Sequence, residues 1–578
     1  RKAAAPMLYK LRGDEKTTHL IESAAIPVSQ LVNYFKLMYE ILEKYGLKFS
    51  IIGHIGKGVV HTEPRLNLKN KRDVELLKIL SDEASDLVIS LGGTISGEHG
   101  EGLNRSYYIK KQYPTIYKLF LEVKKILESY NILNPYIKTY FDENQVKERL
   151  RFGKDYSEHN IVEDMNFNWS YRDFITEIDM CNGCSNCTIP TNILRMCPVY
   201  KFDFDEISAP KSKANILRGL ISGELKEDVI RNPLFKAIME RCINCGACTI
   251  ECPSNVNVPK LSMEAKAIYY KNQRIPLFYR LSSNLDYAKI LTPLLVRFNN
   301  YFTSLGLVSN SLSKLINIGS DIKKIKLAEN NLFKKYKNHS NKGDRKILLF
   351  SGCYYNYIEP DISLDTINIL ERHGFQVILP DQFCCGIPAV SKGLVDLAKK
   401  KIIKNIEKWG DIVHDIQYIV SACSSCTYAL KNLWKSIIDD EIIYEISRKT
   451  KLISEVLIDI EFKKNKYNDK EKRKALYHEP CHLKFQSGKN FSLELLKKLE
   501  YLEVQSLDSN CCGMAGSWGM YNKNSLISQK IGDDLKNRIN KKGRDGYYLL
   551  LTDCPSCRMR LKSISKKPVL HPVELLDN

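Results

Sequence analysis

The chain has 578 residues, 18 cysteines and a formal net charge of +20. At roughly 100–200 residues per domain, this length predicts about three to five domains. No apolar run reaches the ~18 residues that a membrane-spanning helix needs, and the start of the chain lacks the pattern of a secretory signal. We therefore expect a cytoplasmic protein whose cysteines bind metals or serve redox chemistry rather than form disulfides.

The lysine and arginine residues do not form the clustered patches that nucleic-acid binding requires. The sequence also has no known nucleic-acid-binding motif, so we expect no nucleic-acid partner. A solvated, lysine-rich surface is the favoured interpretation. The alternative is a basic face that meets an anionic membrane surface, which would make the protein peripheral at the cytoplasmic face of the membrane. Each metal-bound thiolate would also add negative charge and make the loaded chain less basic.

Residues 1 to about 150 contain no cysteine but carry two glycine-rich loops with histidines. His54 and His61 stand seven residues apart in the first loop, and the second contains Glu98 followed by His99. Two imidazoles and one carboxylate make a three-ligand site with an open position, the usual form of a catalytic divalent-metal centre. The sequence thus predicts a metal bound by His54, His61 and Glu98, with His99 as a neighbouring base. Since glycine-rich loops with histidine are common, loops without a metal are the alternative.

On these motifs, the region resembles the C-terminal cap domain of FAD-linked D-2-hydroxyacid dehydrogenases, over residues 1 to about 140. The resemblance implies that the three predicted ligands hold a divalent metal, often zinc, which in turn holds the hydroxyl and carboxylate of the substrate. It also implies that His99 takes the hydroxyl proton while hydride leaves the α-carbon for the flavin. Arg1 and Lys16 fall where this family places a basic pair on the substrate carboxylate.

The chain departs from this family in two places. Between the two histidines the family often has Gly-Asp-Gly-Asn, whereas this chain has Gly56-Lys57-Gly58-Val59. We interpret the change as an altered substrate preference, with loss of activity as the alternative. The chain also opens inside the cap and shows no dinucleotide-binding glycine fingerprint, so we expect that the FAD-holding domain is missing and that this piece forms only one wall of the flavin site.

Residues 165–290 hold eight cysteines in two copies of one pattern, a Cys-x-x-Cys-x-x-Cys triplet followed by a Cys-Pro pair. One tight loop of this kind holds three corners of a 4Fe–4S cubane, and in two-cluster ferredoxins the Cys-Pro cysteine ligates the other cluster. We therefore assign Cys252 to the cluster of the first triplet and Cys197 to that of the second. Zinc, which usually takes paired Cys-x-x-Cys units, and disulfides are the disfavoured alternatives. The expected ligands are Cys181, Cys184, Cys187, Cys197, Cys242, Cys245, Cys248 and Cys252.

Residues 291–345 contain no cysteine and alternate apolar segments with others rich in lysine and asparagine. We expect a linker whose helices pack against the cysteine-rich domains. An amphipathic segment at Leu305–Ile318 that lies on a membrane is the alternative.

The remaining residues are an internal repeat with a period of about 130 residues, right for a duplicated domain. Each copy alternates strands with helices, which predicts an α/β domain with its cysteines at the carboxyl ends of the strands. We expect these domains at residues 346–465 and 470–578. The first copy has Cys353, Cys384, Cys385, Cys423 and Cys426, and the second has Cys481, Cys511, Cys512, Cys554 and Cys557.

Both copies resemble the cysteine-rich CCG domains of heterodisulfide reductase subunits and of the iron–sulfur subunits of glycolate, lactate and glycerol-3-phosphate oxidising enzymes. The resemblance implies one non-cubane iron–sulfur centre in each copy. A vestigial or zinc-holding fold is the alternative. The two cysteine patterns use all 18 cysteines, which indicates that cysteine is present for ligation and not for packing.

The expected fold is multidomain, α+β in the cap, helical in the ferredoxin-type domain and α/β in the duplicated domain. The resemblance to fused flavin and iron–sulfur dehydrogenases implies oxidation of a small 2-hydroxyacid of the D-lactate, glycolate or D-2-hydroxyglutarate type. Electrons would pass from FAD through two 4Fe–4S clusters to a quinone, a cytochrome or a protein acceptor. The alternatives are a non-catalytic electron-transfer subunit and a thiol–disulfide reductase of the heterodisulfide type.

Overall fold

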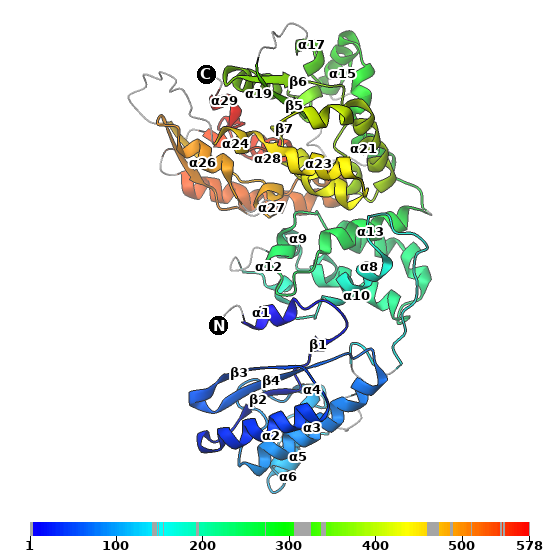
Figure 1. Cartoon of the computed structure of the whole chain (residues 1–578), viewed down its shortest axis with the longest axis vertical. Coiled ribbons are helices and arrows are strands. Elements are labelled where there is room, and N and C mark those ends of the chain that lie inside the picture. Colours follow the sequence, from blue (N-terminus) through cyan, green and yellow to red (C-terminus); the bar gives the residue numbers. More distant parts are fainter. Residues whose placement is uncertain are drawn as a thin grey trace. The chain divides into compact units, whose positions relative to one another are not determined.

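The computed structural model forms two compact units, residues 1–160 with 221–224 and residues 161–220 with 225–578 (Figure 1). The described residues are 4–140, 147, 150–153, 155–191, 196–271, 273–305, 325–336, 343–458, 473–485, 489–509, 511–543, 546 and 549–576. Within these ranges, no helix combines the length and the apolar composition required to cross a bilayer.

The first unit is built around an antiparallel sheet in which β4 pairs with each of the other three strands. Helix α2 buries Leu31, Tyr34, Met38 and Leu42, whose spacing of three or four residues places them on one face. This face and helix α3 contribute to the core of the unit. The strands are β1 (Lys16–Thr17), β2 (Ile21–Ala25), β3 (Phe49–His54) and β4 (Val59–Leu66), and the helices are α1 (Ala4–Tyr9), α2 (Leu31–Lys44), α3 (Lys71–Ser90), α4 (Gly102–Arg105), α5 (Ile109–Gln112) and α6 (Tyr117–Leu127).

The second unit begins with a helical region that carries the ferredoxin-type cysteines. Its helices start at clear signals: Ser170 forms a capping box with Asp173 at α8, and Asn232 caps α11 with a proline at the first helical position. Helix α13 is buried along most of its length and forms the centre of this region. The helices are α8 (Tyr171–Asp179), α9 (Pro198–Asp203), α10 (Pro210–Ile221), α11 (Pro233–Glu240), α12 (Ala247–Glu251), α13 (Val258–Lys271), α14 (Leu277–Ser282) and α15 (Pro293–Leu305).

The duplicated region contains two parallel four-stranded sheets of the same topology. The first has the order β6-β5-β7-β8 and the second β10-β9-β11-β12, so each repeat places its second strand at the edge and its first strand inside. The strands are β5 (Arg345–Leu349), β6 (Phe375–Ile378), β7 (Tyr418–Ser421), β8 (Thr450–Leu452), β9 (Arg473–Tyr477), β10 (Leu502–Ser506), β11 (Leu549–Leu551) and β12 (Val569–Leu570).

Helices connect these parallel strands, as parallel pairing requires. In the first repeat and just before it they are α17 (Leu332–Tyr336), α18 (Tyr354–Tyr357), α19 (Pro360–Arg372), α20 (Ile387–Val390), α21 (Val395–Trp409), α22 (Ser424–Tyr428), α23 (Glu441–Lys449) and α24 (Ile453–Leu457). In the second repeat they are α25 (Cys481–Lys484), α26 (Phe491–Lys497), α27 (Asn522–Lys542), α28 (Pro555–Ile564) and α29 (Val573–Leu576). The expected combination of α+β and α/β parts is confirmed.

The segment before the expected linker already belongs to the first repeat. The turn η7 (Leu285–Ile290) supplies Asp286, whose carboxylate accepts a hydrogen bond from the Cys384 backbone at 2.9 Å and binds the Lys401 ammonium. Burial and the neighbouring Cys384 raise the pKa of Asp286. Most of the segment at 305–318, for which we considered a membrane-lying helix, falls outside the described residues.

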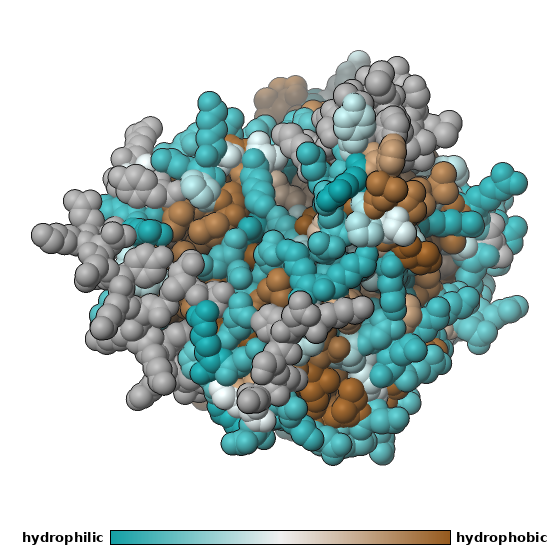
Figure 2. All heavy atoms as spheres, turned by 90° about the horizontal axis from the view of Figure 1, so that it is seen from above, coloured by the Kyte–Doolittle hydropathy of each residue, from teal (hydrophilic) through white to brown (hydrophobic). Residues whose placement is uncertain are grey.

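Viewed from above, the exposed face in Figure 2 is mainly hydrophilic, and hydrophobic side chains gather on it only in small separate patches. A face of this kind agrees with a solvated surface rich in lysine.

Candidate metal centre and iron–sulfur sites

Three histidines of the first unit face one carboxylate oxygen. His54 ends β3, His61 lies in β4, and Glu98 and His99 follow α3. The Nε2 atom of His54 lies 3.4 Å from Glu98 Oε2, and those of His61 and His99 each lie 3.9 Å from it. Donor atoms of His54, His61 and Glu98 all lie within 4.8 Å of one another. The fold thus brings the predicted ligand set together with the predicted base beside it.

The second glycine-rich loop reaches this position by packing closely on β2. Thr94 and Ala25 exchange two backbone hydrogen bonds of 2.8 and 2.9 Å, and the Gly97 amide donates to the Ser23 carbonyl at 2.7 Å. A Cβ atom at Gly97 would lie 2.8 Å from the Ala25 side chain, a distance that real Cβ atoms do not tolerate. Glycine at 97 is therefore required to let Glu98 approach the histidines.

Glu22 in β2 completes the site and was missed by the sequence analysis. Its Oε1 atom lies 2.8 Å from His61 Nδ1 and 2.6 Å from His99 Nδ1, on the ring edges that face away from Glu98. Burial opposes the ionised form of Glu22, but the hydrogen bond from His19 and the charges of His61 and His19 outweigh it and lower the pKa to about 2. An acidic residue at a half-buried position of the short strand β2 was the signal that could have identified it.

His19 and Arg105 hold Glu22 from the outer side. His19 Nδ1 lies 3.5 Å from both Glu22 Oε2 and Glu63 Oε1, and hydrogen bonds to these carboxylates raise its pKa to about 9. The buried Arg105 guanidinium donates to the backbone carbonyls of Glu22, Ile95 and Gly100. Arg105 thereby fixes the β2 backbone and the second glycine-rich loop to each other.

The basic pair expected on a substrate carboxylate stays a prediction. Arg1 lies outside the described residues. The Lys16 ammonium donates to the Leu11 carbonyl at 2.6 Å.

The two ferredoxin-type triplets adopt the same backbone wrap. Left-handed residues occur at the second position after the first cysteine and directly after the second cysteine, at Gly183 and Ser185 in one triplet and at Asn244 and Gly246 in the other. Alternation of this kind turns successive amide groups inward and forms a concavity that favours an anionic group. Both wraps therefore suit an iron–sulfur cubane, whose thiolate-bound form is negatively charged.

The Cys-Pro cysteines lie close to the triplets to which we assigned them. Burial raises the pKa of the Cys252 thiol, and Cys181 and Cys184 of the first triplet raise it further. Burial likewise raises the pKa of Cys197, with a further contribution from Cys242 of the second triplet. Other thiols of the two sites also influence one another, because the sites adjoin.

The cysteines of the duplicated region follow the carboxyl ends of the parallel strands, as expected, and form the same chain of thiol contacts in both repeats. Hydrogen bonds from neighbouring thiols lower the pKa of Cys384 in the first repeat and of Cys512 in the second. Each cysteine of one repeat has a partner in the corresponding position of the other. The order of contacts is Cys353, Cys384, Cys385, Cys426, Cys423 in the first repeat and Cys481, Cys511, Cys512, Cys557, Cys554 in the second.

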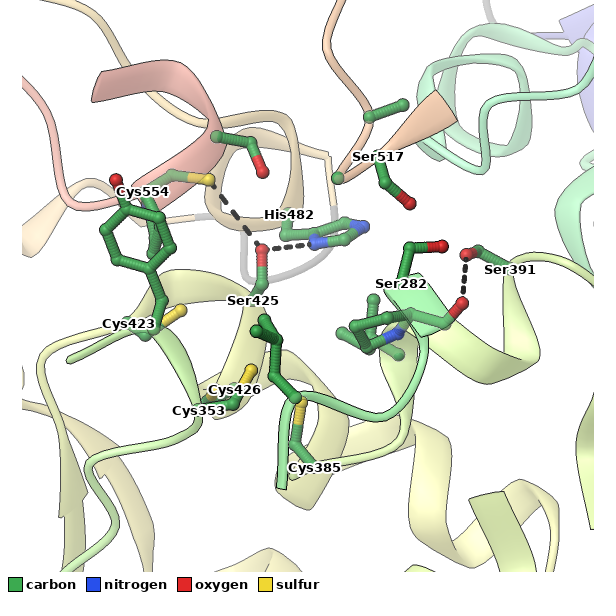
Figure 3. A pocket seen from close by; sticks show the side chains of 18 of the residues that line it. Ser282, Cys353, Cys385, Ser391, Cys423, Ser425, Cys426, His482, Ser517 and Cys554 are labelled. Atoms are coloured by element: carbon green, nitrogen blue, oxygen red, sulfur yellow. Dashed lines mark hydrogen bonds between the residues drawn. The ribbon is translucent and has the colours of Figure 1, made fainter. Parts of the chain in front are cut away.

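A cavity of about 550 Å³ is lined by nine of these ten cysteines, all but Cys384, and by many apolar side chains. Figure 3 shows cysteines at one end, Ser282 and Ser391 toward the other, and His482 with Ser425 between them. His482 Nδ1 lies 2.9 Å from Ser425 Oγ, and the imidazole stacks on Tyr428. Burial lowers the pKa of His482 to about 4, so this histidine is neutral at pH 7.

The second triplet is packed directly against the second repeat. Cys245 shares one hydrophobic cluster with Cys511, Phe485 and Ile531. Burial raises the pKa of Cys245 well above its usual value. Among the neighbouring charges, that of Cys481 in the second repeat raises this pKa most. The structure thus joins a ferredoxin-type site and a CCG site through adjoining thiols.

Comparison with known proteins gives the same three parts in the same order. The family models are FAD linked oxidases, C-terminal domain, over residues 1–137, a 4Fe-4S dicluster domain over residues 177–256, and a cysteine-rich domain, CCG, over residues 347–431 and 475–562. The D-2-hydroxyglutarate dehydrogenase of Haemophilus influenzae is 23% identical to this chain, with all of this chain and 60% of that protein covered. Together, the three matched domains support the resemblance to the fused FAD-linked and iron–sulfur dehydrogenases.

Two further relatives match different shares of the chain. The D-2-hydroxyglutarate dehydrogenase of Pseudomonas putida is 22% identical over the whole chain and 60% of its own length. One subunit of the anaerobic glycerol-3-phosphate dehydrogenase of Escherichia coli is 30% identical over 244 residues, which are 40% of this chain and 58% of that protein. The chain therefore spans about 60% of the length of these curated relatives.

These matches confirm the resemblance that we drew from the motifs, and the matched domains support FAD and 4Fe–4S clusters as cofactors. The donor sets of the described sites suit these groups. All 18 cysteines are free thiols, as cluster ligation requires. The nitrogen and oxygen donors of the cap site suit a divalent ion such as zinc.

Proposed function

We propose that this chain contributes the cap and the iron–sulfur domains of a D-2-hydroxyacid dehydrogenase, with D-lactate, glycolate and D-2-hydroxyglutarate as candidate substrates. The observation that carries the proposal is the arrangement around Glu98, where His99 lies beside a set of metal-ligating groups and is held from behind by Glu22. The two relatives that match this chain over its whole length are D-2-hydroxyglutarate dehydrogenases, which favours testing D-2-hydroxyglutarate first.

Glu22 prepares His99 to act as a base. A carboxylate at Nδ1 holds the proton on that nitrogen, so the Nε2 atom carries the lone pair and points toward Glu98. In this orientation His99 removes the hydroxyl proton of a substrate that lies at the open side of the site. A divalent ion on His54, His61 and Glu98 would polarise the hydroxyl and carboxylate oxygens, and FAD would accept the hydride.

The contacts within the second unit support a direction for the electrons. A two-electron oxidation must be matched to one-electron carriers, which the eight ferredoxin-type cysteines are suited to hold. Because Cys245 adjoins Cys481 and Cys511, the second triplet is the natural donor to the second repeat. The iron–sulfur centres held by the nine lining cysteines would themselves occupy the cavity between the repeats, and a quinone, a cytochrome and a protein are the candidate acceptors.

The test is anaerobic stopped-flow reduction of the holoenzyme that contains this chain, with each hydroxyacid in turn and with a His99→Asn variant. Loss of the base should slow reduction of the flavin by substrate about 10²-fold or more, while reduction of the iron–sulfur centres by dithionite stays unchanged. If the substrate reduces the flavin at equal rates in the wild-type protein and in His99→Asn, the proposal is contradicted and an electron-transfer subunit is favoured.

A second candidate function is that of a thiol–disulfide reductase, which the cysteine-lined cavity favours. Disulfide reduction by the chain with an artificial electron donor, independent of flavin and of His99, would favour it. Absence of that activity in protein with a full iron content would exclude it.

A further inference from the structure

The two repeats differ at the residue that follows their first strand. Phe350 follows β5 and donates its backbone amide to the Val420 carbonyl at 2.8 Å, and His478 follows β9 and donates in the same way to Leu551 at 2.8 Å. In the first repeat the Phe350 ring packs against two tryptophans. The second repeat therefore replaces an apolar core residue with an imidazole at the same place in the fold.

The His478 side chain is only 1% exposed, and one of its nitrogens makes no hydrogen bond of normal geometry to a described residue. The Nδ1 atom lies 2.6 Å from Ser509 Oγ. The buried Nε2 atom makes no hydrogen bond of normal geometry among the described residues, and the imidazole instead interacts with the Cys512 thiol, whose pKa it lowers. Because buried polar atoms are nearly always satisfied in folded proteins, this nitrogen points to a group that binds it.

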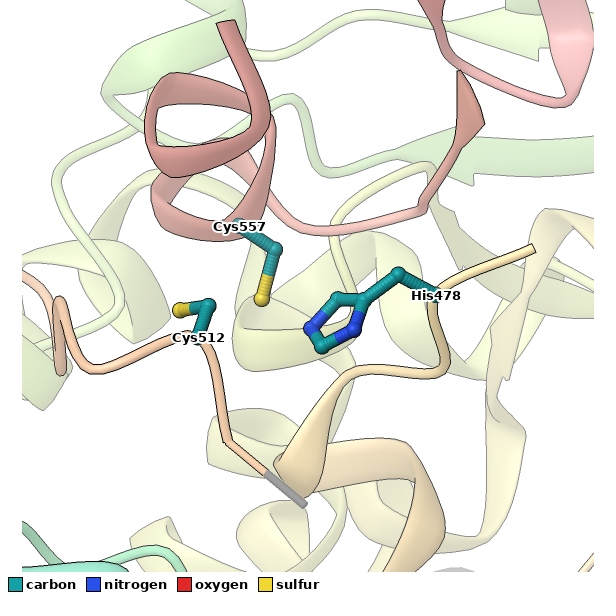
Figure 4. Close-up of side chains that lie close together, drawn as sticks. All are labelled: His478, Cys512 and Cys557. Atoms are coloured by element: carbon teal, nitrogen blue, oxygen red, sulfur yellow. The ribbon is translucent and has the colours of Figure 1, made fainter. Parts of the chain in front are cut away.

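This nitrogen belongs to a buried histidine that faces two thiols of the second repeat. Donor atoms of His478, Cys512 and Cys557 all lie within 4.8 Å of one another, and all three residues are buried. Figure 4 shows the imidazole ring pointing toward the two sulfurs, of which that of Cys557 comes from helix α28 and that of Cys512 from a loop. One imidazole nitrogen and two thiolates form a mixed donor set of the kind that binds iron or zinc.

We propose that His478 is a ligand, through Nε2, of the iron–sulfur centre held by the second repeat. The proposal rests on the iron–sulfur assignment of that repeat under the proposed function. The Ser509 hydroxyl accepts a hydrogen bond from the Nδ1–H group and so fixes the tautomer and the orientation of the ring, as the outer partners of metal-bound histidines do.

This ligand would make the two repeats chemically unequal. The first repeat, with Phe350 at the equivalent position, offers sulfur donors alone there. His478 stands where the first repeat has Phe350, so the imidazole would be an additional neutral ligand beside the same five cysteines and would alter the coordination of the centre without changing its charge. The centre of the second repeat, which adjoins the Cys245 site, would therefore differ in reduction potential from that of the first repeat.

The test is electron–nuclear double resonance on the reduced, iron-loaded chain labelled with ¹⁵N-histidine. A coupling of the size of a directly bonded imidazole nitrogen should be present in the wild-type protein and lost in His478→Gln. It should persist in the control variant His482→Gln, which removes the other histidine near this centre. No such coupling, a coupling of hydrogen-bond size, or its persistence in His478→Gln would each overturn the proposal.

Iron analysis separates this proposal from the one on which it rests. Iron that accounts only for two cubanes, about eight per chain, would overturn the iron–sulfur assignment of the repeats and the ligand with it. Full iron without the coupling would overturn the ligand alone. If His478→Gln fails to assemble, Ser509→Ala serves instead. It should retain the strong coupling but change the potential of this centre, whereas unchanged potential and coupling would contradict a bonded, serine-oriented imidazole.

Discussion

Replacement of Glu22 by glutamine tests whether this carboxylate holds the cap site together. The substitution preserves the size of the side chain and one acceptor oxygen, but removes the charge that faces His61 Nδ1 at 2.8 Å and His99 Nδ1 at 2.6 Å. His61, the proposed metal ligand, and His99, the proposed base, would both lose their oriented tautomer, so the effect should appear in metal affinity and in turnover.

The size of the effect follows from these two contacts. A hydrogen bond to a charged group contributes about 1.5–3 kcal/mol and a neutral one about 0.5–1.5 kcal/mol, so each contact loses about 1–1.5 kcal/mol. About 1.4 kcal/mol corresponds to a factor of ten. We therefore expect metal affinity to fall about tenfold through His61 and turnover to fall about a further tenfold through His99, within the range known for outer partners of metal ligands.

The assay is titration of the full chain with Mn²⁺, followed by the loss of the electron paramagnetic resonance signal of the free ion. Mn²⁺ suits oxygen donors rather than thiolates, so the cysteine sites do not interfere. Glu63→Gln is the matched control, because Glu63 is also buried and faces His19 but contacts neither His61 nor His99. Affinity within twofold of wild type in Glu22→Gln, or an equal loss in both variants, would refute the reasoning.

Three further predictions address other parts of the chain. In Gly97→Ala the new Cβ, 2.8 Å from Ala25, should displace the Glu98 loop and weaken Mn²⁺ binding at least tenfold; binding like that of wild type would show that the loop adapts. Cys252→Ser should remove the cubane signal of the first triplet in electron paramagnetic resonance and leave that of the second; loss of the second signal alone would reverse the assignment. Burial lowers the pKa of His571 to about 4 from its usual 6.5. Between these pH values only the unfolded chain takes up the proton. The free energy of unfolding therefore falls as the pH falls, by about 3 kcal/mol in all. The melting temperature of His571→Gln should fall less between pH 7 and pH 5 than that of the wild-type protein, and an equal fall in both proteins would contradict this.

Features that are local in the sequence were predictable. The spacing of the triplets and the Cys-Pro pairs predicted cubane ligands, the resemblance of the Cys-Cys-Gly repeats to CCG domains implied further iron–sulfur centres, and the apolar runs before the cysteines indicated strands. The carboxyl ends of parallel strands meet at one edge of a sheet, which explains why the cysteines of each repeat gather as expected. His54, His61 and Glu98 could be grouped because glycine-rich loops mark both segments.

The residues that sequence reasoning missed act across the chain and have no motif of their own. Glu22 reaches His61 and His99 from another strand, and Asp286 reaches Cys384 from a turn 98 residues earlier. His478 occupies the position that Phe350 has in the first repeat, and its partners Cys512 and Cys557 lie far away in the sequence. In each case the tertiary fold was needed to show the partner of the residue.

The hydrophobic cluster that joins Cys245 to Cys511 has a consequence for how the protein matures. Under the proposed assignment, ligands of two different centres lie in one core with Phe485 and Ile531. The packing of this core and the loading of either centre are therefore coupled, and a change at one centre should disturb the other.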